Sequence, residues 1–247
     1  MRQGFLVPVY RHGKTACPLA ERLAALGMPV IIVDDGNDDQ TKALLAECAA
    51  KTPGVSLVSL KKNIGKGGAA AKGFEKAAEM GLTHVLMIDA DGQHEEGKIA
   101  FFLAESAKHP DMVICGYPEF DGSAPKSRVT GRKISNFWAA VVTLSTELKD
   151  VLCGFRVYPV NESLRVTRCL LMDKRMGFDA EILVRLYWKK VFTVFFPVKV
   201  SYPQDGVSNF RVVRDNIRIS WMFSRLFMGM LIRLPLLIAR KIKCGKK

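Results

Sequence analysis

Short apolar runs alternate with longer stretches in which apolar residues recur every three or four positions, from the N-terminus to about residue 116. The short runs, at residues 4–10, 29–34, 55–60, 84–89 and 112–116, predict strands. The stretches between them, at residues 14–27, 38–50, 67–80 and 95–109, predict helices. Regular alternation of strand and helix is typical of a mostly parallel sheet with helices on both faces. We therefore expect an α/β fold.

The regular alternation of strand-like and helix-like stretches ends after residue 116. Residues 117–132 are polar, basic and interrupted by proline and glycine, so they predict a long loop of the kind that is often functional. Further patterns predict a helix at 134–148, a strand at 151–158, another helix within 172–190 and a β-rich run at 191–202. The chain ends in a long apolar and basic stretch at residues 217–243, which predicts an amphipathic helix.

Composition narrows the class of protein. Hydrophobic residues make up 49% of the 247 positions, which excludes a disordered chain and suits one large domain with an appendage. We place the domain at residues 1–212 and the appendage at 213–247. The 37 Lys and Arg against 24 Asp and Glu give a net charge of +13, which points to an anionic partner. Nucleic acid, a phosphorylated substrate and an anionic membrane surface all satisfy this requirement.

The charge is concentrated in the C-terminal segment, where residues 216–247 hold eight Lys or Arg and no acid. Residues 219–239 are long enough to span a bilayer, but Arg225 and Arg233 would each cost about 2.5–3.5 kcal/mol near its centre. A helix lying in the membrane interface fits this pattern better, and a helix packed on the domain is the alternative. The N-terminus runs directly into an apolar strand without a signal peptide, so we expect a cytoplasmic protein, peripheral on the inner face of the membrane.

Acidic residues follow two of the predicted strands. Asp34 and Asp35 end the second strand, while Asp89 and Asp91 end the fourth. Ligands of open α/β sheets bind beyond the carboxyl ends of the strands, where two carboxylates and diphosphate oxygens form a suitable site for Mg²⁺ or Mn²⁺. Taken singly, each acid could also serve only as a turn residue or helix cap.

A glycine-rich turn offers a competing interpretation. Residues 65–70 fit the pattern G-x-G-x-x-A between a strand and a helix, as in an NAD(P)-dependent oxidoreductase. The turn opens the third strand–helix unit rather than the first, which weakens that hypothesis. Close packing of helix on strand is the simpler explanation of these small residues.

Four motifs, taken together, resemble family 2 glycosyltransferases. They are VPVY at residues 7–10, IIVDDG at 31–36, NIGKG at 63–67 and DADGQH at 89–94. The resemblance is strongest to enzymes that transfer mannose or glucose to dolichyl or polyprenyl phosphate, and residues 216–221 are also similar to bacterial members of aryl-polyene and related lipid pathways. It implies a GT-A fold, a nucleotide-sugar donor, a divalent metal and inversion at the transferred sugar.

The resemblance also implies roles for individual residues. Contacts to the nucleotide sugar are expected from Pro8, Val9, Tyr10, Val33, Asp34, Asp35, Lys66, Asp89 and Ala90. Asp89 and Asp91 would hold the metal, and Gln93 would lie beside the sugar. On the acceptor side, Asp179 is the first candidate base and Glu181 the second. Phosphate contacts are expected from Arg128, Arg132, Lys133, Arg156 and Arg211, because guanidinium groups bind phosphate in a bidentate manner.

The sequence departs from the family pattern at two places. Arg11 and His12 stand where the family has Asn-Glu, and the Gly206–Ser208 turn lacks the expected flanking basic residues. The resulting hypothesis is transfer of a hexose from UDP- or GDP-sugar to a polyprenyl phosphate or a lipid hydroxyl at the cytosolic membrane surface. Only a hydroxyl acceptor needs a base, because a phosphate is already an anion. The NAD(P) oxidoreductase and a basic nucleic-acid-binding protein are the alternatives.

Overall fold

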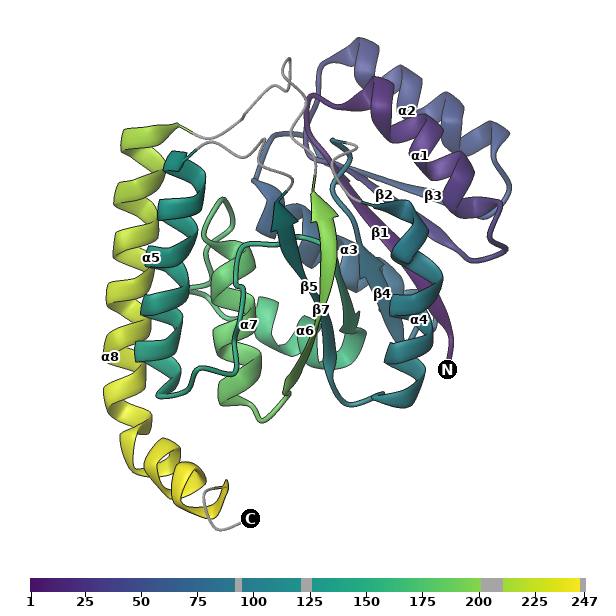
Figure 1. Ribbon diagram of the computed structural model, residues 1–247. Coiled ribbons are helices and arrows are strands. Elements are labelled where there is room, and N and C mark those ends of the chain that lie inside the picture. The colour runs from purple at the N-terminus through teal and green to yellow at the C-terminus, as the bar shows by residue number, and fades with distance from the viewer. Residues whose placement is uncertain (92–94, 121–125, 201–210, 245–247) are drawn as a thin grey trace.

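One mixed β-sheet forms the centre of the protein in the computed structural model, which describes residues 1–91, 95–120, 126–200 and 211–244. Seven strands of the described part follow the order β3-β2-β1-β4-β6-β5-β7 (Figure 1). They are β1 (Gln3–Val9), β2 (Val30–Asp34), β3 (Val55–Ser59), β4 (His84–Met87), β5 (Val113–Phe120), β6 (Arg156–Pro159) and β7 (Thr193–Val200). Only β6 runs antiparallel to its neighbours β4 and β5, so the predicted mostly parallel sheet is confirmed.

Helices cover both faces of the sheet because successive side chains of a strand point to opposite sides. In β1, Leu6 belongs to one buried cluster and Phe5 and Val7 belong to the other. Helices α1 (Gly13–Ala24), α2 (Asp39–Lys51) and α4 (Ile99–Lys108) cover the Phe5 face, with the short 3₁₀ turn Glu96–Lys98 before α4. The Leu6 face is covered by α3 (Lys66–Glu79), α5 (Lys126–Thr143), α6 (Val160–Thr167), α7 (Phe178–Trp188) and α8 (Val212–Cys244).

The prediction of a long loop at residues 117–132 is wrong at both ends, and its middle, residues 121–125, lies outside the described residues. β5 extends to Phe120 because it pairs with β7 over its whole length, and α5 already begins at Lys126. The first turns of α5 are largely exposed, so they lack the apolar periodicity that would have revealed a helix. The strand predicted at 151–158 is shorter than expected, since β6 begins only at Arg156, and α6 follows it without having been predicted.

Helix α8 packs beside α5 along one side of the domain (Figure 1). Its buried face supplies Met222, Phe223, Leu226 and Met230 to the same core as α3 and α7. By length and composition alone, residues 213–242 could cross a membrane.

The three arginines along the middle and end of α8 are used within the protein. Arg225 donates to the carbonyl oxygen of Leu171, and Arg233 lies 4.7 Å above the ring of Trp188. Arg240 lies 5.1 Å above the ring of Tyr187 and donates to its carbonyl oxygen. The opposite face of the helix is therefore exposed and mainly apolar, formed by Ile217, Trp221, Met228, Leu231, Ile232, Leu236, Ile238 and Ile242.

Candidate functional site

A large cleft of about 1850 Å³ opens at the carboxyl ends of β1, β2 and β4 and extends to helices α5 and α8. The strand ends contribute carboxylates and an aromatic ring, α7 contributes one further carboxylate, and α5 and α8 contribute arginines and apolar side chains. The structure brings together most of the residues that the sequence indicated. Those lining the cleft are Pro8, Val9, Tyr10, Asp35, Lys66, Asp89, Ala90, Asp91, Arg128, Arg132, Asp179 and Arg211.

Five other predicted residues do not line the cleft, and Gln93 lies outside the described residues. Val33 and Asp34 are fully buried in β2, below the rim. Arg156 and Glu181 are also fully buried, and Lys133 is exposed on α5 away from the cleft. Contact between these five side chains and a ligand therefore stays a prediction that the cleft does not support.

Asp35 is a nearly buried carboxylate with a fixed orientation. It accepts hydrogen bonds from Asn63 Nδ2 at 2.8 Å, Ile64 N at 2.7 Å and Gly65 N at 2.9 Å. Arg175 Nη1 donates to Asn63 Oδ1 at 2.9 Å, which helps to fix the amide that donates to Asp35. Burial raises the pKa of Asp35, although the two backbone donors and Arg175 act in the opposite direction. The geometry suits acceptance of a hydrogen bond from a ring N–H of a base.

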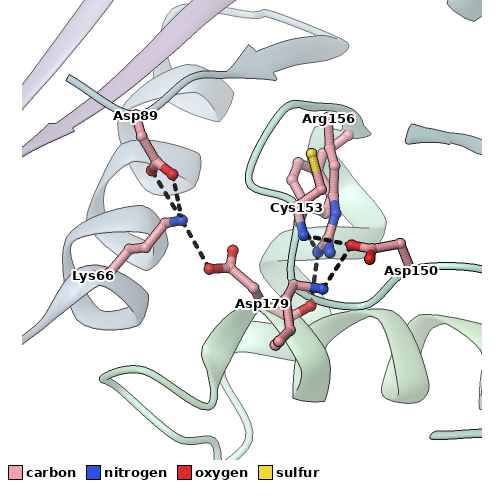
Figure 2. A network of polar contacts seen from close by, with 8 residues as sticks. Lys66, Asp89, Asp150, Cys153, Arg156 and Asp179 are labelled. Carbon is pink, nitrogen blue, oxygen red and sulfur yellow. Dashed lines mark hydrogen bonds and ion pairs between the residues drawn. The ribbon is translucent and has the colours of Figure 1, made fainter. Parts of the chain in front are cut away.

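Lys66 links carboxylates from two parts of the cleft, Asp89 after β4 and Asp179 in α7. Its Nζ lies 2.9 Å and 3.1 Å from the two carboxylate oxygens of Asp89 and 2.8 Å from Asp179 Oδ2 (Figure 2). Burial acts to lower the pKa of Lys66, but Asp179 and Asp89 outweigh it, so the pKa is raised and the ammonium stays charged. A Cβ at Gly154 would lie 2.5 Å from Asp89 Oδ2 and 2.8 Å from Lys66 Nζ, so a side chain at this position would displace the ends of Asp89 and Lys66.

Asp179 is held from two sides in the first turn of α7. Arg156 Nη1 donates to the Asp179 carbonyl oxygen at 2.7 Å and to the Tyr158 hydroxyl at 3.0 Å. The predicted phosphate ligand Arg156 thus anchors the backbone of the candidate base. The second carboxylate oxygen of Asp179, Oδ1, is buried and has no hydrogen-bond partner among the described residues, although the residue itself lines the cleft.

Glu181 is two residues further along α7, and its carboxylate faces the interior. It pairs with Arg185 at 2.6 Å and accepts a hydrogen bond from Asp173 N at 2.7 Å. Because a base must reach the proton that it removes, the geometry favours Asp179 over Glu181.

Helices α5 and α8 begin beside one another at the same end of the domain (Figure 1). Basic side chains from these two helix starts line the cleft. Arg132 Nη1 pairs with both oxygens of Asp150, at 2.6 Å and 2.5 Å. Asp150 also accepts from the backbone N–H of Leu152 and Cys153, which shapes the loop before β6 (Figure 2). Arg128 of α5 and, near the start of α8, Arg211, Arg214 and Arg218 line the same part of the cleft.

The residues fit a divalent metal that is shared with a ligand. The described part of the chain contains no cluster of three His, Cys, Asp or Glu that could hold an ion alone. Asp89 and Asp91 line one cleft, and Mg²⁺ or Mn²⁺ is commonly bound by one or two carboxylates with phosphate oxygens and water completing the shell. Asp89 and Asp91 would hold such an ion, which supplies charge neutralisation for a diphosphate.

The glycine turn serves a structural purpose. Gly67 N and Gly68 N both donate to the carbonyl oxygen of Lys174, at 3.0 Å and 3.2 Å. These are N-terminal amides of α3, which a dinucleotide pyrophosphate would have to bind. Because the Lys174 carbonyl already occupies both amides, they are not available to a pyrophosphate, which counts against the oxidoreductase alternative.

The substitution Gly65→Ala is expected to destabilise the protein by about 3 kcal/mol, because strain and overpacking add. Gly65 has φ +91°, and a Cβ would lie 2.3 Å from the carbonyl oxygen of Lys174. Gly27→Ala is the matched control, since Gly27 has φ +74° but no atom within 4 Å of its Cβ position. It is expected to cost about 1 kcal/mol. Urea unfolding measures both, and equal losses would show that the contact with Lys174 is unimportant.

Some residues of the site were not identified from the sequence. Asn63 stands in one of the quoted motifs without a role having been derived for it, while Arg175 and Asp150 carried no signal. Arg218 lies in a basic segment for which the sequence predicted only membrane contact, while Arg214 had been considered beside Arg211 as a substitute for the basic residues missing around the Gly206–Ser208 turn. Each gains its place through packing between distant parts of the chain.

Comparisons with known proteins agree with this geometry. Residues 5–159 match the model of the family described as "Glycosyl transferase family 2". A dolichyl-phosphate beta-glucosyltransferase of Dictyostelium discoideum is 31% identical over 211 residues, covering 78% of this chain but only 63% of that protein. An undecaprenyl-phosphate mannosyltransferase of Micrococcus luteus is 26% identical over 190 residues, covering 75% of this chain and 77% of that protein.

Solved structures share the fold. The glucosyl-3-phosphoglycerate synthase of Mycobacterium tuberculosis, crystallised with Mn²⁺, UDP-glucose and phosphoglyceric acid, matches with a TM-score of 0.61 and 14% identity. The match covers 94% of this chain and 78% of that one. At this identity the likeness speaks for the fold, and the GT-A architecture implied by the sequence motifs is confirmed.

Proposed function

Because the chain belongs to glycosyl transferase family 2, we propose that it transfers a hexose from UDP- or GDP-sugar to polyprenyl phosphate at a membrane surface. One observation carries the proposal: the strand-end acids, Lys66 and the arginines of α5 and α8 line a single cleft that continues into an apolar wall. A cleft of this kind offers places for a nucleotide, a diphosphate, a phosphate and a hydrocarbon chain in sequence.

The donor occupies the strand-end part of the cleft in this proposal. The base lies between Pro8, Tyr10 and Asp35, whose fixed carboxylate accepts a hydrogen bond from a ring N–H. The diphosphate lies toward Asp89 and Asp91, where a divalent metal and the Lys66 ammonium offset its negative charge.

The acceptor lies on the opposite side of the sugar. One oxygen of the acceptor forms a bond to the anomeric carbon while the bond from that carbon to the diphosphate oxygen breaks, so configuration inverts and the nucleoside diphosphate leaves. A phosphate acceptor attacks as the anion and transfers no proton, whereas a hydroxyl would deliver its proton to Asp179 Oδ1. The cluster of Arg128, Arg132 and Arg211 favours the phosphate.

The far part of the cleft suits the hydrocarbon chain of the acceptor. Ile134 and Trp138 from α5 and Phe223 and Phe227 from α8 line the same cleft as the arginines. Burial of an apolar chain against these side chains is favourable at about 25 cal/mol per Å². A polar head at the arginines and a chain between α5 and α8 is the arrangement that the lining supports.

The function is tested by incubating the protein with UDP- or GDP-hexoses, Mg²⁺ or Mn²⁺, and vesicles that contain a polyprenyl phosphate. We expect sugar to pass into the lipid fraction with one nucleotide and only when metal is present. A long-chain polyprenol without phosphate serves as the control for a hydroxyl acceptor. No transfer to either lipid with any donor would contradict the proposal.

Acceptor affinity is expected to depend on Arg128 and not on Lys133. Arg128 lines the cleft, whereas Lys133 lies on the same helix but outside it. Arg128→Ala removes a charge-assisted contact to phosphate, so the KM for the acceptor rises about tenfold. Lys133→Ala leaves it unchanged. Equal effects in steady-state assays with varied lipid phosphate would mean that only the overall charge matters.

Membrane binding is expected to depend on the exposed face of α8. The triple substitution of Trp221, Ile232 and Leu236 by serine removes three exposed apolar side chains, each worth about 1.5–3 kcal/mol when fully buried. Binding to anionic vesicles in flotation should fall by more than about 100-fold. Leu26→Ser and Leu170→Ser, at exposed positions elsewhere, are the controls. Flotation of the triple variant would place the membrane contact on another face.

A further inference from the structure

The segment of residues 171–176, between α6 and α7, lies against the glycine turn that carries Lys66. The carbonyl oxygen of Lys174 accepts the amides of Gly67 and Gly68, and Arg175 bonds to Asn63. A Cβ at Gly67 would lie 2.7 Å from the carbonyl oxygen of Asp173, so the two backbones are in close contact. The segment therefore supports two parts of the cleft, the turn that contains Lys66 and the residues that hold Asp35.

Two charged side chains hold the segment in turn. Glu181 of α7 is fully buried and accepts the Asp173 amide at 2.7 Å. Arg225 of α8 donates to the Leu171 carbonyl oxygen and lies 3.5 Å from Glu181 Oε2. Arg185 of α7 pairs with the other oxygen of Glu181 at 2.6 Å. None of these three side chains lines the cleft.

Glu181 and Arg225 are better placed to position residues 171–176 than to take part in the reaction. A fully buried carboxylate is retained only when it is hydrogen-bonded and paired, and the partners of Glu181 belong to α7, to the segment and to α8. Contacts lead from α8 through Arg225 to residues 171–176, from there to the glycine turn, and from the turn to Lys66, Asp89 and Asp179.

We propose that Glu181 and Arg225 are positioning residues through which helix α8 holds residues 171–176 against the glycine turn and thereby sets the affinity for nucleoside diphosphate. The inference rests on the proposed function for its ligand, but the positioning itself can be observed without one. It also assigns Glu181, a candidate base by sequence, a role in binding rather than in proton transfer.

Amide hydrogen exchange of the full-length protein, without ligand, tests the positioning directly. In Arg225→Gln, the Gly67 and Gly68 amides should exchange about tenfold faster, because the segment that carries their acceptor, Lys174, loses the bond from Arg225 to Leu171. Arg233→Gln is the matched control on the same helix, since Arg233 contacts Trp188 and Gly229 rather than the segment. Unchanged exchange in Arg225→Gln, or equal acceleration in both variants, would overturn the inference.

Nucleoside diphosphate affinity tests the consequence. Titration calorimetry with UDP and GDP in the presence of Mn²⁺ should show a dissociation constant about tenfold higher for Arg225→Gln than for the unaltered protein. Arg225→Lys keeps the charge and one donor group, so it should recover part of the affinity even if the glutamine variant folds poorly. In transfer assays the KM for the donor should rise while kcat is kept.

The outcomes separate the two proposals. Faster exchange with a raised dissociation constant and a kept kcat supports the inference. A lower melting temperature with unchanged exchange and affinity would show that Arg225 is merely structural and overturn it. Absence of nucleoside diphosphate binding by the unaltered protein would overturn the proposed function and the ligand part of the inference. Faster exchange of Gly67 and Gly68 would in that case still support the positioning.

Discussion

Replacing Asp91 with alanine is expected to lower the rate of hexose transfer by about 1000-fold, equivalent to about 4 kcal/mol of transition-state stabilisation. Asp91 lines the cleft beside Asp89 after β4. In the proposed reaction, the departing diphosphate would gather negative charge there. Without the second carboxylate, the proposed divalent ion would lose one of the two side chains that would hold it, and the charge of the leaving group would no longer be neutralised. Transfer of labelled hexose into lipid at saturating donor measures the effect.

A thermal shift measurement separates loss of the metal site from loss of the fold. A ligand present at 100 times its dissociation constant stabilises a protein by about 2.7 kcal/mol. UDP or GDP with Mn²⁺ should therefore raise the melting temperature of the unaltered protein and of Asp111→Ala, whose carboxylate is exposed and lies outside the cleft. Asp91→Ala should melt normally but show no metal-dependent shift. A retained shift would place the metal elsewhere.

Substitution of Lys66 by methionine is expected to reduce transfer by about 100-fold or more, because a preorganised cation in the site is lost. Methionine keeps much of the side-chain length but leaves Asp89 and Asp179 facing each other with no positive charge between them (Figure 2). The two carboxylates then repel, and the diphosphate loses a partner. The loss should fall mainly on kcat, with a lower melting temperature besides.

Lys62→Met is the control for this substitution, because Lys62 is an exposed residue a few positions earlier and outside the cleft. It should keep both activity and melting temperature. If Lys66→Met loses stability but keeps kcat, Lys66 holds the two carboxylates only for the sake of the fold. Wild-type kcat in a stable Lys66→Met would contradict both roles.

The α/β fold could be predicted because its signals are local. Strands buried on both faces, such as β2 with all of its residues buried, appear as continuous apolar runs, and the helices between them show their own period. The prediction failed where burial is set by distant partners. β5 reaches Phe120 because β7 pairs with it along its whole length. The polar start of α5 is helical although most of its described side chains are exposed, so it shows no apolar pattern.

The site residues could likewise be predicted where local motifs place them and not where distant packing does. The ends of β1, β2 and β4 carry Tyr10, Asp35, Asp89 and Asp91, and parallel strands bring their ends to one edge, so a local motif was enough to place them in one cleft. Arg156 and Glu181 stand in equally suggestive motifs, but their side chains point into the core. Whether a charged residue of α7 or β6 faces a cleft or the interior depends on how these elements pack.

The sequence by itself determined the alternation of strands and helices, the acids at the strand ends and the basic character of the C-terminal segment, because each depends on neighbouring residues. Only the tertiary structure decided that Lys66 joins Asp89 to Asp179 and that the arginines of α8 face the domain. It also decided that residues 171–176 support the glycine turn. These contacts join residues more than twenty positions apart, and their distances follow from the packing of whole elements rather than from any local pattern.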